Sequence, residues 1–535
     1  MSDGNDLEAD LVIALQTLDT HSFKDTLQKS TIDMTSLQDQ NKTNIFHEFA
    51  KSVIREKLLM DFLEITISFF YKRYGENAPE SIKFLMNSST VEEKISPLHL
   101  AVKSGKLKLT KEYVRMGGDT EAKTSKNQTI GHMASIHGSM SILAYLKYEV
   151  GINVQEKDSN GMTPLHLAAK YGNEYVVLSL LAWKCDINSI DNDKNTPLHL
   201  AAFSGNYRVC RALLFAGADR KFLNSLGENP YAVANKQGNV DVLKLLANPS
   251  ILARINPFKH PVKPVKNSYK LYAFFVILFI LRYLLVILFV IPHLDIEFAV
   301  ASLIIFLFST VTFMMVSHSN PGFVHFRRKE TMVFLYQTYQ AEFVCPFCET
   351  RKPPKARHCP YCDRCVKKYD HHCPWIRNCV GRGNHKLFIV FIICICIDFL
   401  YNAVVGIMDY LNLFSAPSNK FFSVNEYRPE AALIISIISF ISFLFTCPVA
   451  FIQITNAIKN TTTHERFAYN KNTKTTISKT ITSSMPSMTL IRTSEERGGD
   501  AYTGNNISVS VSSIKKSKYC CYGSSNKITE MLSPE

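Results

Sequence analysis

Residues 161–173 read GMTPLHLAAKYGN, and the same pattern returns at 195–206 as NTPLHLAAFSGN and at 96–106 as SPLHLAVKSGK. Weaker copies begin at 129 (TIGHMASIHGS) and at 229 (NPYAVANKQGN). One histidine of the pattern recurs at intervals of 33, 34 and 33 residues, as His99, His132, His166 and His199. Self-similarity at this period indicates stacked supersecondary units that share one elongated core.

The pattern resembles the ankyrin repeat, a helix pair with the signature T-P-L-H-x-A and a period of 33 residues. IFHEFAKS, with His47, is interpreted as a divergent first copy, and KLLMDFLEITISFF at 57–70 as a repeat helix. The resemblance implies a solenoid over 40–250. Because each histidine occupies the same place in its copy, a structural hydrogen-bonding role is favoured over metal binding. The last copy has Ala232 at this place, as expected for an atypical terminal repeat.

The composition of the 535-residue chain excludes several classes of protein. With 46% hydrophobic and 20% charged residues, it is not collagen-like, wholly disordered or a small disulfide scaffold. The net charge is +14, and residues 317–386 contribute +8 of it, with 13 basic and 5 acidic residues. The opening MSDGNDLEAD has no basic and apolar regions of a signal peptide. We therefore expect reduced thiols, so that a dense Cys/His cluster indicates a metal or catalytic site.

Four apolar runs, at 271–291, 298–316, 387–408 and 431–454, follow the repeats. Each is long enough to cross a bilayer, since about 20 apolar residues cover the hydrocarbon core. Lysines precede the first run, whereas the two short outer loops carry little positive charge, so the positive-inside rule places both termini in the cytosol. The predicted fold class is mainly α: an N-terminal ankyrin-repeat solenoid plus a four-helix transmembrane bundle with a cytosolic two-zinc cysteine-rich domain.

The predicted division of the chain has seven segments. They are an N-terminal segment at 1–39, ankyrin repeats at 40–250, a basic linker at 251–270, spans one and two at 271–316, a cytosolic cysteine-rich domain at 317–386, spans three and four at 387–454, and a cytosolic tail at 455–535. The tail is rich in Ser, Thr, Asn and Lys and is expected to be largely disordered. Lipid modification and unmodified thiols are about equally favoured for its Cys520 and Cys521.

Seven cysteines and four histidines lie within CPFCETRKPPKARHCPYCDRCVKKYDHHCPWIRNCVGRGNHKLF at 345–388. The C-x2-C spacing recurs three times, and two tetrahedral zinc sites need eight such ligands. This density indicates two zinc ions. The ligand count alone does not separate a spare cysteine from the ligands.

The run Asp370-His371-His372-Cys373 with its flanks resembles the DHHC cysteine-rich domain of protein S-acyltransferases (palmitoyltransferases), and the match continues to Phe388. The resemblance implies two structural Zn²⁺ ions. One would be held by Cys345, Cys348, His358 and Cys365, and the other by Cys359, Cys362, His372 and Cys379.

The same resemblance leaves Cys373 as the nucleophile, with His371 as its base and Asp370 to orient the imidazole. A long-chain acyl-CoA (palmitoyl-CoA) would acylate Cys373, and a cysteine of a protein substrate would then take the acyl group, in a ping-pong reaction. The repeats are expected to recruit the protein substrates through their concave face. The family suggests the Golgi membrane, with the ER, plasma and endosomal membranes as alternatives; the oligomeric state is left open.

Three further positions bear on the resemblance. TTHE at 462–465 has the form of the family's T-T-x-E motif, so Thr463 is expected to hydrogen-bond near Asp370, with Glu465 as the motif's acid. Asn384 continues the family layout. Asn320 stands where the family usually has the aspartate of Asp-Pro-Gly. Ankyrin-bearing members commonly have six spans, whereas four fit here.

Basic residues around the predicted site have two interpretations, binding of CoA phosphates and contact with anionic headgroups. They are Arg351, Lys352, Lys355, Arg357, Arg364, Lys367 and Lys368. Nucleic-acid binding is disfavoured because a zinc module between two spans cannot readily reach a duplex. An ion channel would need a re-entrant loop that the short outer loops cannot supply. A zinc adaptor would leave the DHHC and TTHE motifs unexplained.

Two ionisable residues lie inside the apolar runs, Arg282 in the first and Asp398 in the third. Each is the twelfth residue of its run, so at 1.5 Å per residue both lie about 17 Å deep. An unpaired charge at this depth is costly, and the sequence therefore predicts that the two form an ion pair between the spans. The pair is interpreted either as purely architectural or as the far end of an acyl-chain cavity.

Overall fold

The computed structural model describes residues 2–30, 33–35, 41–247, 269–291, 294–324, 330–411, 413, 429–463 and 465–466. All of these belong to one compact unit, Met1–Asn472. Most of the predicted basic linker and of the predicted tail, including Cys520 and Cys521, lies outside the described residues.

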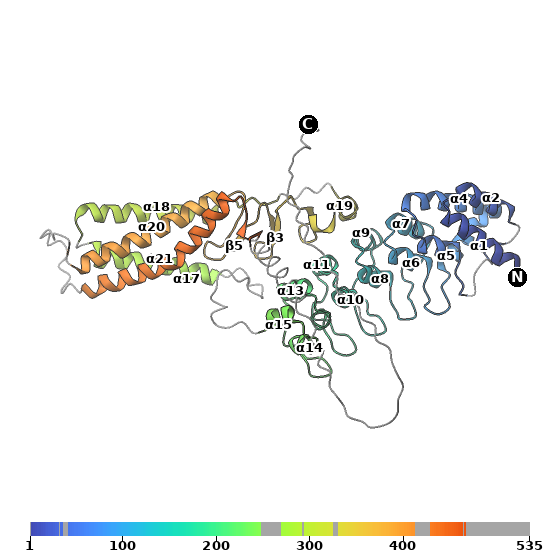
Figure 1. Cartoon of the computed structure of the whole chain (residues 1–535), viewed down its shortest axis with the longest axis horizontal. Helices are drawn as coiled ribbons and strands as arrows, with labels where there is room; N and C mark the ends of the chain where they lie inside the picture. The colour runs from blue at the N-terminus through green and yellow to red at the C-terminus, as the bar shows by residue number, and fades with distance from the viewer. Residues whose placement is uncertain are drawn as a thin grey trace, which may run out of the picture. The chain divides into compact units, whose positions relative to one another are not determined.

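The predicted repeat region consists of short helices stacked side by side (Figure 1). They are α3 (Ile45–Lys51), α4 (Glu56–Tyr74), α5 (Ala78–Asn87), α6 (Pro97–Lys103), α7 (Leu107–Arg115), α8 (Ile130–His137), α9 (Met140–Tyr145), α10 (Pro164–Tyr171), α11 (Glu174–Ala182), α12 (Pro197–Phe203), α13 (Tyr207–Ala216), α14 (Pro230–Lys236) and α15 (Val240–Leu246). The first helix of one repeat packs on the first helix of the next, from α8 through α10 and α12 to α14. The ankyrin solenoid predicted from the TPLH pattern is present.

Three of the repeat histidines, His132, His166 and His199, contact a backbone carbonyl oxygen of the following repeat. His166 Nδ1 accepts a hydrogen bond from the backbone N–H of Thr163 at 3.1 Å, and its Nε2 lies 3.1 Å from the carbonyl oxygen of Asn195 in the following repeat. A carbonyl only accepts, so the ring is the neutral Nε2–H tautomer, and burial lowers the pKa of His166. In the last repeat Asn229 Oδ1 takes over the cap by accepting from Ala232 N at 2.9 Å.

Two helices precede the first predicted repeat, α1 (Ser2–Gln16) and α2 (Thr20–Lys29). The sequence analysis assigned no repeat to 1–39, yet Leu11 and Phe23 are fully buried in the core that the repeats share. Phe23 meets Phe62 of α4 edge to face, with ring centroids 5.1 Å apart. These helices therefore extend the solenoid; they lack the TPLH signature by which the other copies were found.

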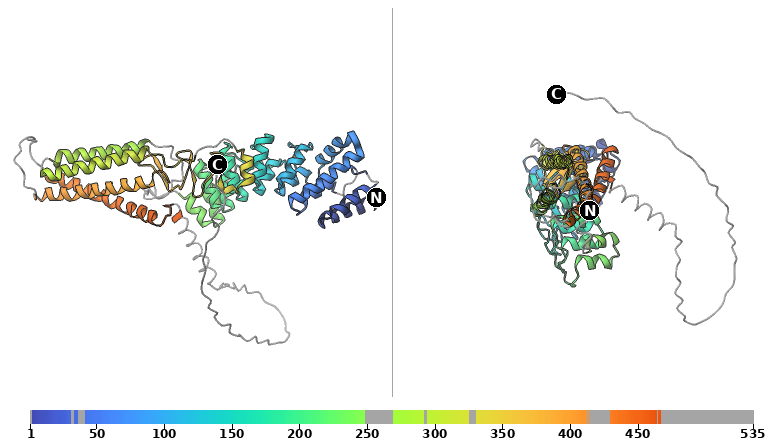
Figure 2. Two further views of the ribbon diagram at one scale, coloured as in Figure 1. Left: turned by 90° about the horizontal axis from the view of Figure 1, so that it is seen from above. Right: turned by 90° about the vertical axis from the view of Figure 1, so that its left-hand side faces the viewer.

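Four long apolar helices form a bundle: α17 (Tyr269–Phe289), α18 (Ile296–His318), α20 (His385–Tyr410) and α21 (Pro429–Ile458). They lie side by side in Figures 1 and 2, where α20 packs on both α18 and α21. The last three are long and apolar enough to cross a membrane, with 23 to 29 residues each. The apolar part of α17, Tyr272–Leu288, is shorter, so its length alone does not settle a fourth crossing.

Between α18 and α20 the chain makes a helix and three small hairpins. After α19 (Met332–Thr338) and the 3-10 helix η4 (Ala341–Phe343), strands β1 (Val344–Cys345) and β2 (Thr350–Arg351), β3 (Arg357–Cys359) and β4 (Arg364–Val366), and β5 (His371–Cys373) and β6 (Asn378–Val380) pair antiparallel. The registers place His358 opposite Cys365 and His372 opposite Cys379. Ligand side chains distant in sequence are thereby brought together.

Candidate active site

The hairpins gather two four-residue Cys/His clusters, the two sets expected from the sequence. One consists of Cys345, Cys348, His358 and Cys365, and the other of Cys359, Cys362, His372 and Cys379, with the ligand atoms of each set within 4.8 Å of one another. In the second set, the Cys362 Sγ atom lies 3.4 Å from both Cys379 Sγ and His372 Nδ1.

These separations fit zinc. Bonds of about 2.3 Å to sulfur at tetrahedral angles put two sulfur ligands about 3.8 Å apart. An aromatic ring stacks on the histidine of each cluster, Phe347 on His358 at 4.8 Å and Tyr361 on His372 at 4.7 Å between centroids. The rings hold the imidazoles in a fixed orientation, as a structural metal site requires.

Cys373, the cysteine of the DHHC run, lies outside both clusters. Cys373 ends β5 and is 7% exposed, packed in one apolar cluster with Phe313 of α18 and Phe391 of α20. The next residue but one, Trp375, meets Phe275 of α17 edge to face at 5.7 Å between centroids. The thiol therefore lies where the hairpins meet one end of the apolar bundle.

Asp370 and His371 stand beside this thiol. His371 Nδ1 lies 2.8 Å from Asp370 Oδ2, so the carboxylate fixes which ring nitrogen carries the proton. Burial by itself would lower the pKa of His371, but the interactions with Asp370 and Cys373 outweigh it and raise the pKa to about 10. Burial would raise the pKa of Asp370, yet His371 and Thr463 hold it well below its usual range. The site thus favours an imidazolium next to a carboxylate.

The Asp370 carboxylate is held by residues at the end of α21 and in the turn that follows it. Thr463 donates to it from its backbone N–H and, at 2.8 Å, from its hydroxyl. Gln453 Nε2 donates to the same Oδ2 atom at 3.1 Å, and Asn456 Nδ2 donates to the Thr463 hydroxyl at 2.9 Å. The contact expected from the T-T-x-E motif is present. Gln453, at the end of the apolar run 431–454, and Asn456, just beyond it, carried no sequence signal.

Two other predicted positions have local structural tasks. Glu465 caps the turn by accepting from Thr462 N at 2.9 Å, and it pairs with Lys355 at 3.2 Å, which joins the motif to the hairpins. Asn384, 1% exposed, donates to the carbonyl of Cys379 at 2.9 Å and accepts from Gly381 N at 3.0 Å. It thereby fixes the turn between the second metal cluster and α20.

Asn320 closes a tight turn after α18. Its Oδ1 accepts from Gly322 N at 2.9 Å and Phe323 N at 3.1 Å. An asparagine oxygen makes the contacts that an aspartate would make here, so the departure from Asp-Pro-Gly leaves this turn intact. Asn378, which the sequence analysis did not single out, donates to the carbonyl of Ser319 at 2.8 Å and so joins β6 to the same turn.

Arg282 and Asp398 form an ion pair between α17 and α20, the pairing expected from their equal depth. The side chains are 9% and 0% exposed. Asp398 Oδ1 also accepts from Asn402 Nδ2 at 2.9 Å, and the guanidinium lies 4.8 Å from the centroid of Phe399. A buried ion pair needs such additional partners to offset the desolvation of both charges.

Family models match both the region with the Cys/His clusters and the repeat region. Residues 338–470 match the family model described as DHHC palmitoyltransferase. Two stretches, 98–191 and 180–257, match ankyrin repeats (3 copies). The chain thus carries a DHHC domain, of the family that comprises protein S-acyltransferases, together with ankyrin repeats.

Curated relatives match this chain over only a small part of their own length. Alpha-latrotoxin-Lg1a of Latrodectus geometricus is 35% identical over 135 residues, which cover 25% of this chain and 9% of the toxin. A transient receptor potential cation channel subfamily A member 1 homolog of Caenorhabditis elegans is 29% identical over 150 residues, 26% of this chain and 12% of the channel. Delta-latroinsectotoxin-Lt1a of Latrodectus tredecimguttatus is 32% identical over 125 residues, 22% of this chain and 10% of the toxin. The chain spans about a tenth of the length of these relatives.

Proposed function

We propose that the chain is a protein-cysteine S-acyltransferase that moves a long-chain fatty acyl group from acyl-CoA to cysteines of protein substrates. The observation that carries the proposal is the placement of Cys373. It is the cysteine of the DHHC run left outside both metal clusters, it lies beside His371 and Asp370, and it packs against the apolar bundle. A fatty acyl chain could therefore enter the apolar region while its thioester stays at the thiol.

The first half-reaction acylates Cys373. His371 holds the proton of the Cys373 thiol as the imidazolium that the site favours, and the sulfur attacks the thioester carbonyl of acyl-CoA. The bond from the carbonyl carbon to the CoA sulfur breaks, and coenzyme A leaves with the proton that His371 returns. Asp370 stabilises the imidazolium formed in between and holds the ring by its 2.8 Å contact.

The second half-reaction repeats these steps with a protein cysteine as the nucleophile. His371 takes the proton of the incoming thiol, a new thioester forms on the substrate, and the Cys373 thiol is regenerated. One thioester replaces another in each half, so no further energy source is needed. This is the ping-pong course expected from the sequence.

The two Cys/His clusters would hold structural Zn²⁺. When bound, each ion would crosslink two hairpins of a domain whose own apolar cluster is small. His372 belongs to the second cluster and lies between His371 and Cys373 in strand β5. The second cluster therefore holds Asp370, His371 and Cys373 in place.

The membrane arrangement is part of the proposal. With α17 as a fourth crossing, the repeats before α17, the hairpins between α18 and α20, and the chain after α21 all fall on one side of the membrane. The lysine-rich linker marks that side as cytosolic. The repeats would recruit protein substrates there, and the Golgi is the compartment that the family resemblance favours.

The Arg282–Asp398 pair is proposed to close the far end of the space for the acyl chain. Replacing Asp398 by Ala or Tyr and competing palmitoyl-CoA with shorter and longer acyl-CoAs tests this role. A shifted chain-length preference is expected. An unchanged preference with lower yield of folded protein would make the pair purely architectural.

The proposed activity is tested by comparing wild-type protein with Cys373→Ser. Both are purified in detergent, incubated with alkyne-tagged palmitoyl-CoA and treated with hydroxylamine, which cleaves thioesters. Hydroxylamine-sensitive label on the wild type and little on the variant is expected. Equal label on both would place the acyl group elsewhere, for instance on Cys520 or Cys521. No label on either, in protein shown to hold two zinc ions, would favour a zinc adaptor.

A further inference from the structure

Helix α19 lies between the second apolar helix and the hairpins in sequence, yet it belongs to the core of the ankyrin repeats. Its residues Met332, Val333, Leu335 and Tyr336 are all at most 9% exposed and join the same apolar cluster as the repeat helices. Helix α19 packs on α9 of the repeats. More than 80 residues and two apolar helices separate α15, the last repeat helix, from this segment.

Polar contacts reinforce this packing on both sides of α19. The hydroxyl of Tyr336 lies 3.1 Å from Ser179 Oγ on α11. The hydroxyl of Tyr148 donates to Glu349 Oε1 at 2.9 Å and accepts from Trp183 Nε1 at 2.9 Å. We call this set the α19 clamp; it comprises Met332, Val333, Leu335, Tyr336 and Glu349 on one side and Tyr148, Ser179 and Trp183 on the other.

Residues anchored on the repeats are direct sequence neighbours of ligands of the first metal cluster. Glu349 directly follows the ligand Cys348, and Val344, which directly precedes the ligand Cys345, is 1% exposed in the repeat core. Chain segments within one or two residues of the metal ligands are therefore anchored on the repeats. A displacement of the repeats would have to move the first cluster or open the clamp.

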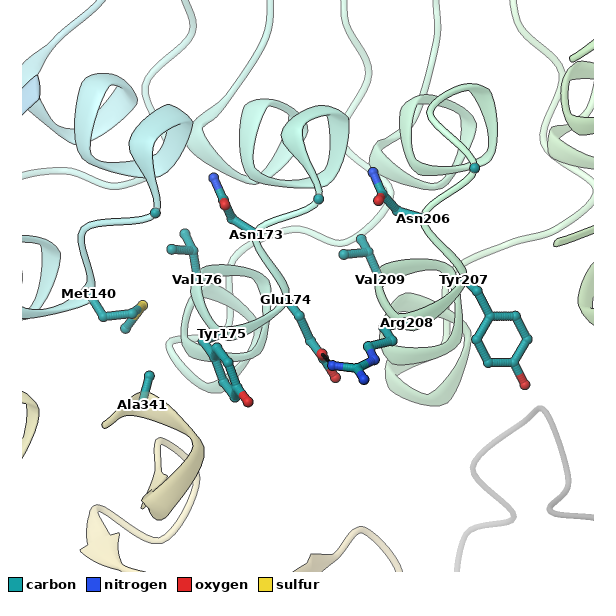
Figure 3. A pocket seen from close by; sticks show the side chains of 13 residues that line it. Met140, Asn173, Glu174, Tyr175, Val176, Asn206, Tyr207, Arg208, Val209 and Ala341 are labelled. Atoms are coloured by element: carbon teal, nitrogen blue, oxygen red, sulfur yellow. Dashed lines mark ion pairs between the residues drawn. The ribbon is translucent and has the colours of Figure 1, made fainter. Parts of the chain in front are cut away.

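A cavity of about 470 Å³ lies between the repeats and Ala341 of η4, the 3-10 helix that follows α19 (Figure 3). The repeats line it with Tyr175 and with Glu174 and Arg208, which pair at 3.5 Å, and Ala341 of η4 lines it from the other side. The width of this cavity therefore depends on the clamp, because the clamp determines where Ala341 lies opposite the repeats.

We propose that the α19 clamp joins the ankyrin repeats and the two-cluster domain into one body, so that a protein bound to the repeats presents its cysteine at a fixed separation from Cys373. This rests on the proposed acyl transfer. An acceptor cysteine is then acylated only if its distance from the docking site on the repeats matches this separation. Without the clamp, only the covalent connections would limit this distance.

The test uses an acceptor whose reach can be set. A single-domain antibody raised against the surface of α3 to α7, which contains no clamp residue, carries Gly/Ser linkers of graded length that end in a cysteine. Full-length protein in nanodiscs is loaded with tagged palmitoyl-CoA, and transfer to each acceptor is measured. Self-acylation of Cys373 without acceptor is measured in parallel.

Two neighbouring substitutions supply the comparison. Leu335→Asp places a charge at a position that is 1% exposed, whereas Phe334→Asp makes the same change at a side chain that is 45% exposed. Leu335→Asp is expected to separate α19 from the repeats, and Phe334→Asp is expected to leave the clamp intact. Hydrogen exchange of the α19 amides reports which of the two has happened.

Wild type and Phe334→Asp are expected to show transfer with a clear optimum in linker length. In Leu335→Asp the optimum flattens and its maximum falls about three- to tenfold, because the effective concentration of a tethered cysteine depends on the span it must cover. Self-acylation stays within about twofold of wild type.

The inference is overturned if Leu335→Asp speeds exchange of the α19 amides but keeps the length optimum. Unchanged exchange in this variant also contradicts it, since the clamp would then not depend on the burial of Leu335. Absence of any thioester on Cys373 in the wild type refutes the proposed function instead, and the exchange comparison still decides whether the clamp exists.

Discussion

The charge of Asp370 is expected to control the proton on His371, and Asp370→Asn removes that charge with little change in shape. In the wild type the contacts with Asp370 and Cys373 raise the pKa of His371 to about 10, from an ordinary value of 6.5, against the opposing effect of burial. Loss of the Asp370 charge removes the first-named of these contacts. We expect the pKa of His371 to fall by about two to three units, equivalent to about 3–4 kcal/mol at 1.36 kcal/mol per unit.

The consequence is a smaller population of the reactive ion pair. Each unit lost from the pKa of His371 makes proton transfer from Cys373 about ten times less favourable. At pH 7.4 the rate of Cys373 acylation should therefore fall about 10²- to 10³-fold in Asp370→Asn. The remaining activity should rise with pH, because the thiolate then forms without the help of His371.

The assay is the initial rate of hydroxylamine-sensitive labelling by tagged palmitoyl-CoA between pH 6 and pH 9. Zinc content, measured by atomic absorption, must stay at two ions per chain, since Asp370 is not a ligand. Asp241→Asn, an exposed position on α15, is the charge-matched control and should behave as wild type. A rate within threefold of wild type at pH 7.4 in zinc-loaded Asp370→Asn would refute the role assigned to Asp370, that of stabilising the protonated His371.

The pKa shifts of His371 and Asp370 also determine how the stability of the fold changes with pH. The folded-state pKa of His371 is raised, so its contribution to stability is fully present below about pH 6.5 and is lost as the pH rises toward 10. The folded-state pKa of Asp370 is depressed, so its contribution is present at neutral pH and is lost as the pH falls below its ordinary value near 3.8. The β5–β6 hairpin is therefore expected to be most stable between about pH 3.8 and about pH 6.5.

Three further substitutions probe other parts of the chain. Cys365→Ser should lower the zinc content from two ions to one and increase protease cleavage between β1 and β4, because a structural zinc site contributes on the order of 10 kcal/mol to folding. Asp398→Asn should destabilise the bundle by about 3–5 kcal/mol in thermal unfolding by leaving Arg282 buried without its counter-ion, and the double variant with Arg282→Met should recover much of the loss. His166→Ala should destabilise the repeats by about 1–3 kcal/mol in denaturant unfolding, since two buried backbone groups lose their partner; Tyr171→Ala at an exposed position of the same helix is the control.

The parts of the fold that were predictable from sequence have short-range signals. A TPLH copy carries its own cap, its own helix start and its own histidine within a dozen residues. The metal ligands are likewise spaced so that a hairpin or a C-x2-C turn brings them together, as at His358 and Cys365. Four apolar runs were visible because each exceeds the length that a core helix needs.

Predictions across long sequence separations succeeded where chemistry supplied a reason. Arg282 and Asp398 were paired because two unmatched charges at equal depth are costly. Thr463 was placed near Asp370 because of a family motif. Gln453, which donates to the same carboxylate, was missed because a glutamine at the end of an apolar run has no periodic or motif signal.

The sequence by itself predicted the repeat architecture, the membership of the two Cys/His clusters and the cysteine that lies outside them, because each follows from local spacing or from a family pattern. Only the tertiary structure decided that α1 and α2 extend the solenoid, and that α19 packs into the repeats rather than with the hairpins that follow it. Both depend on which apolar faces meet in space. An amphipathic pattern predicts that one face of a helix will be buried. Which surface covers that face depends on the packing of all the elements of the chain.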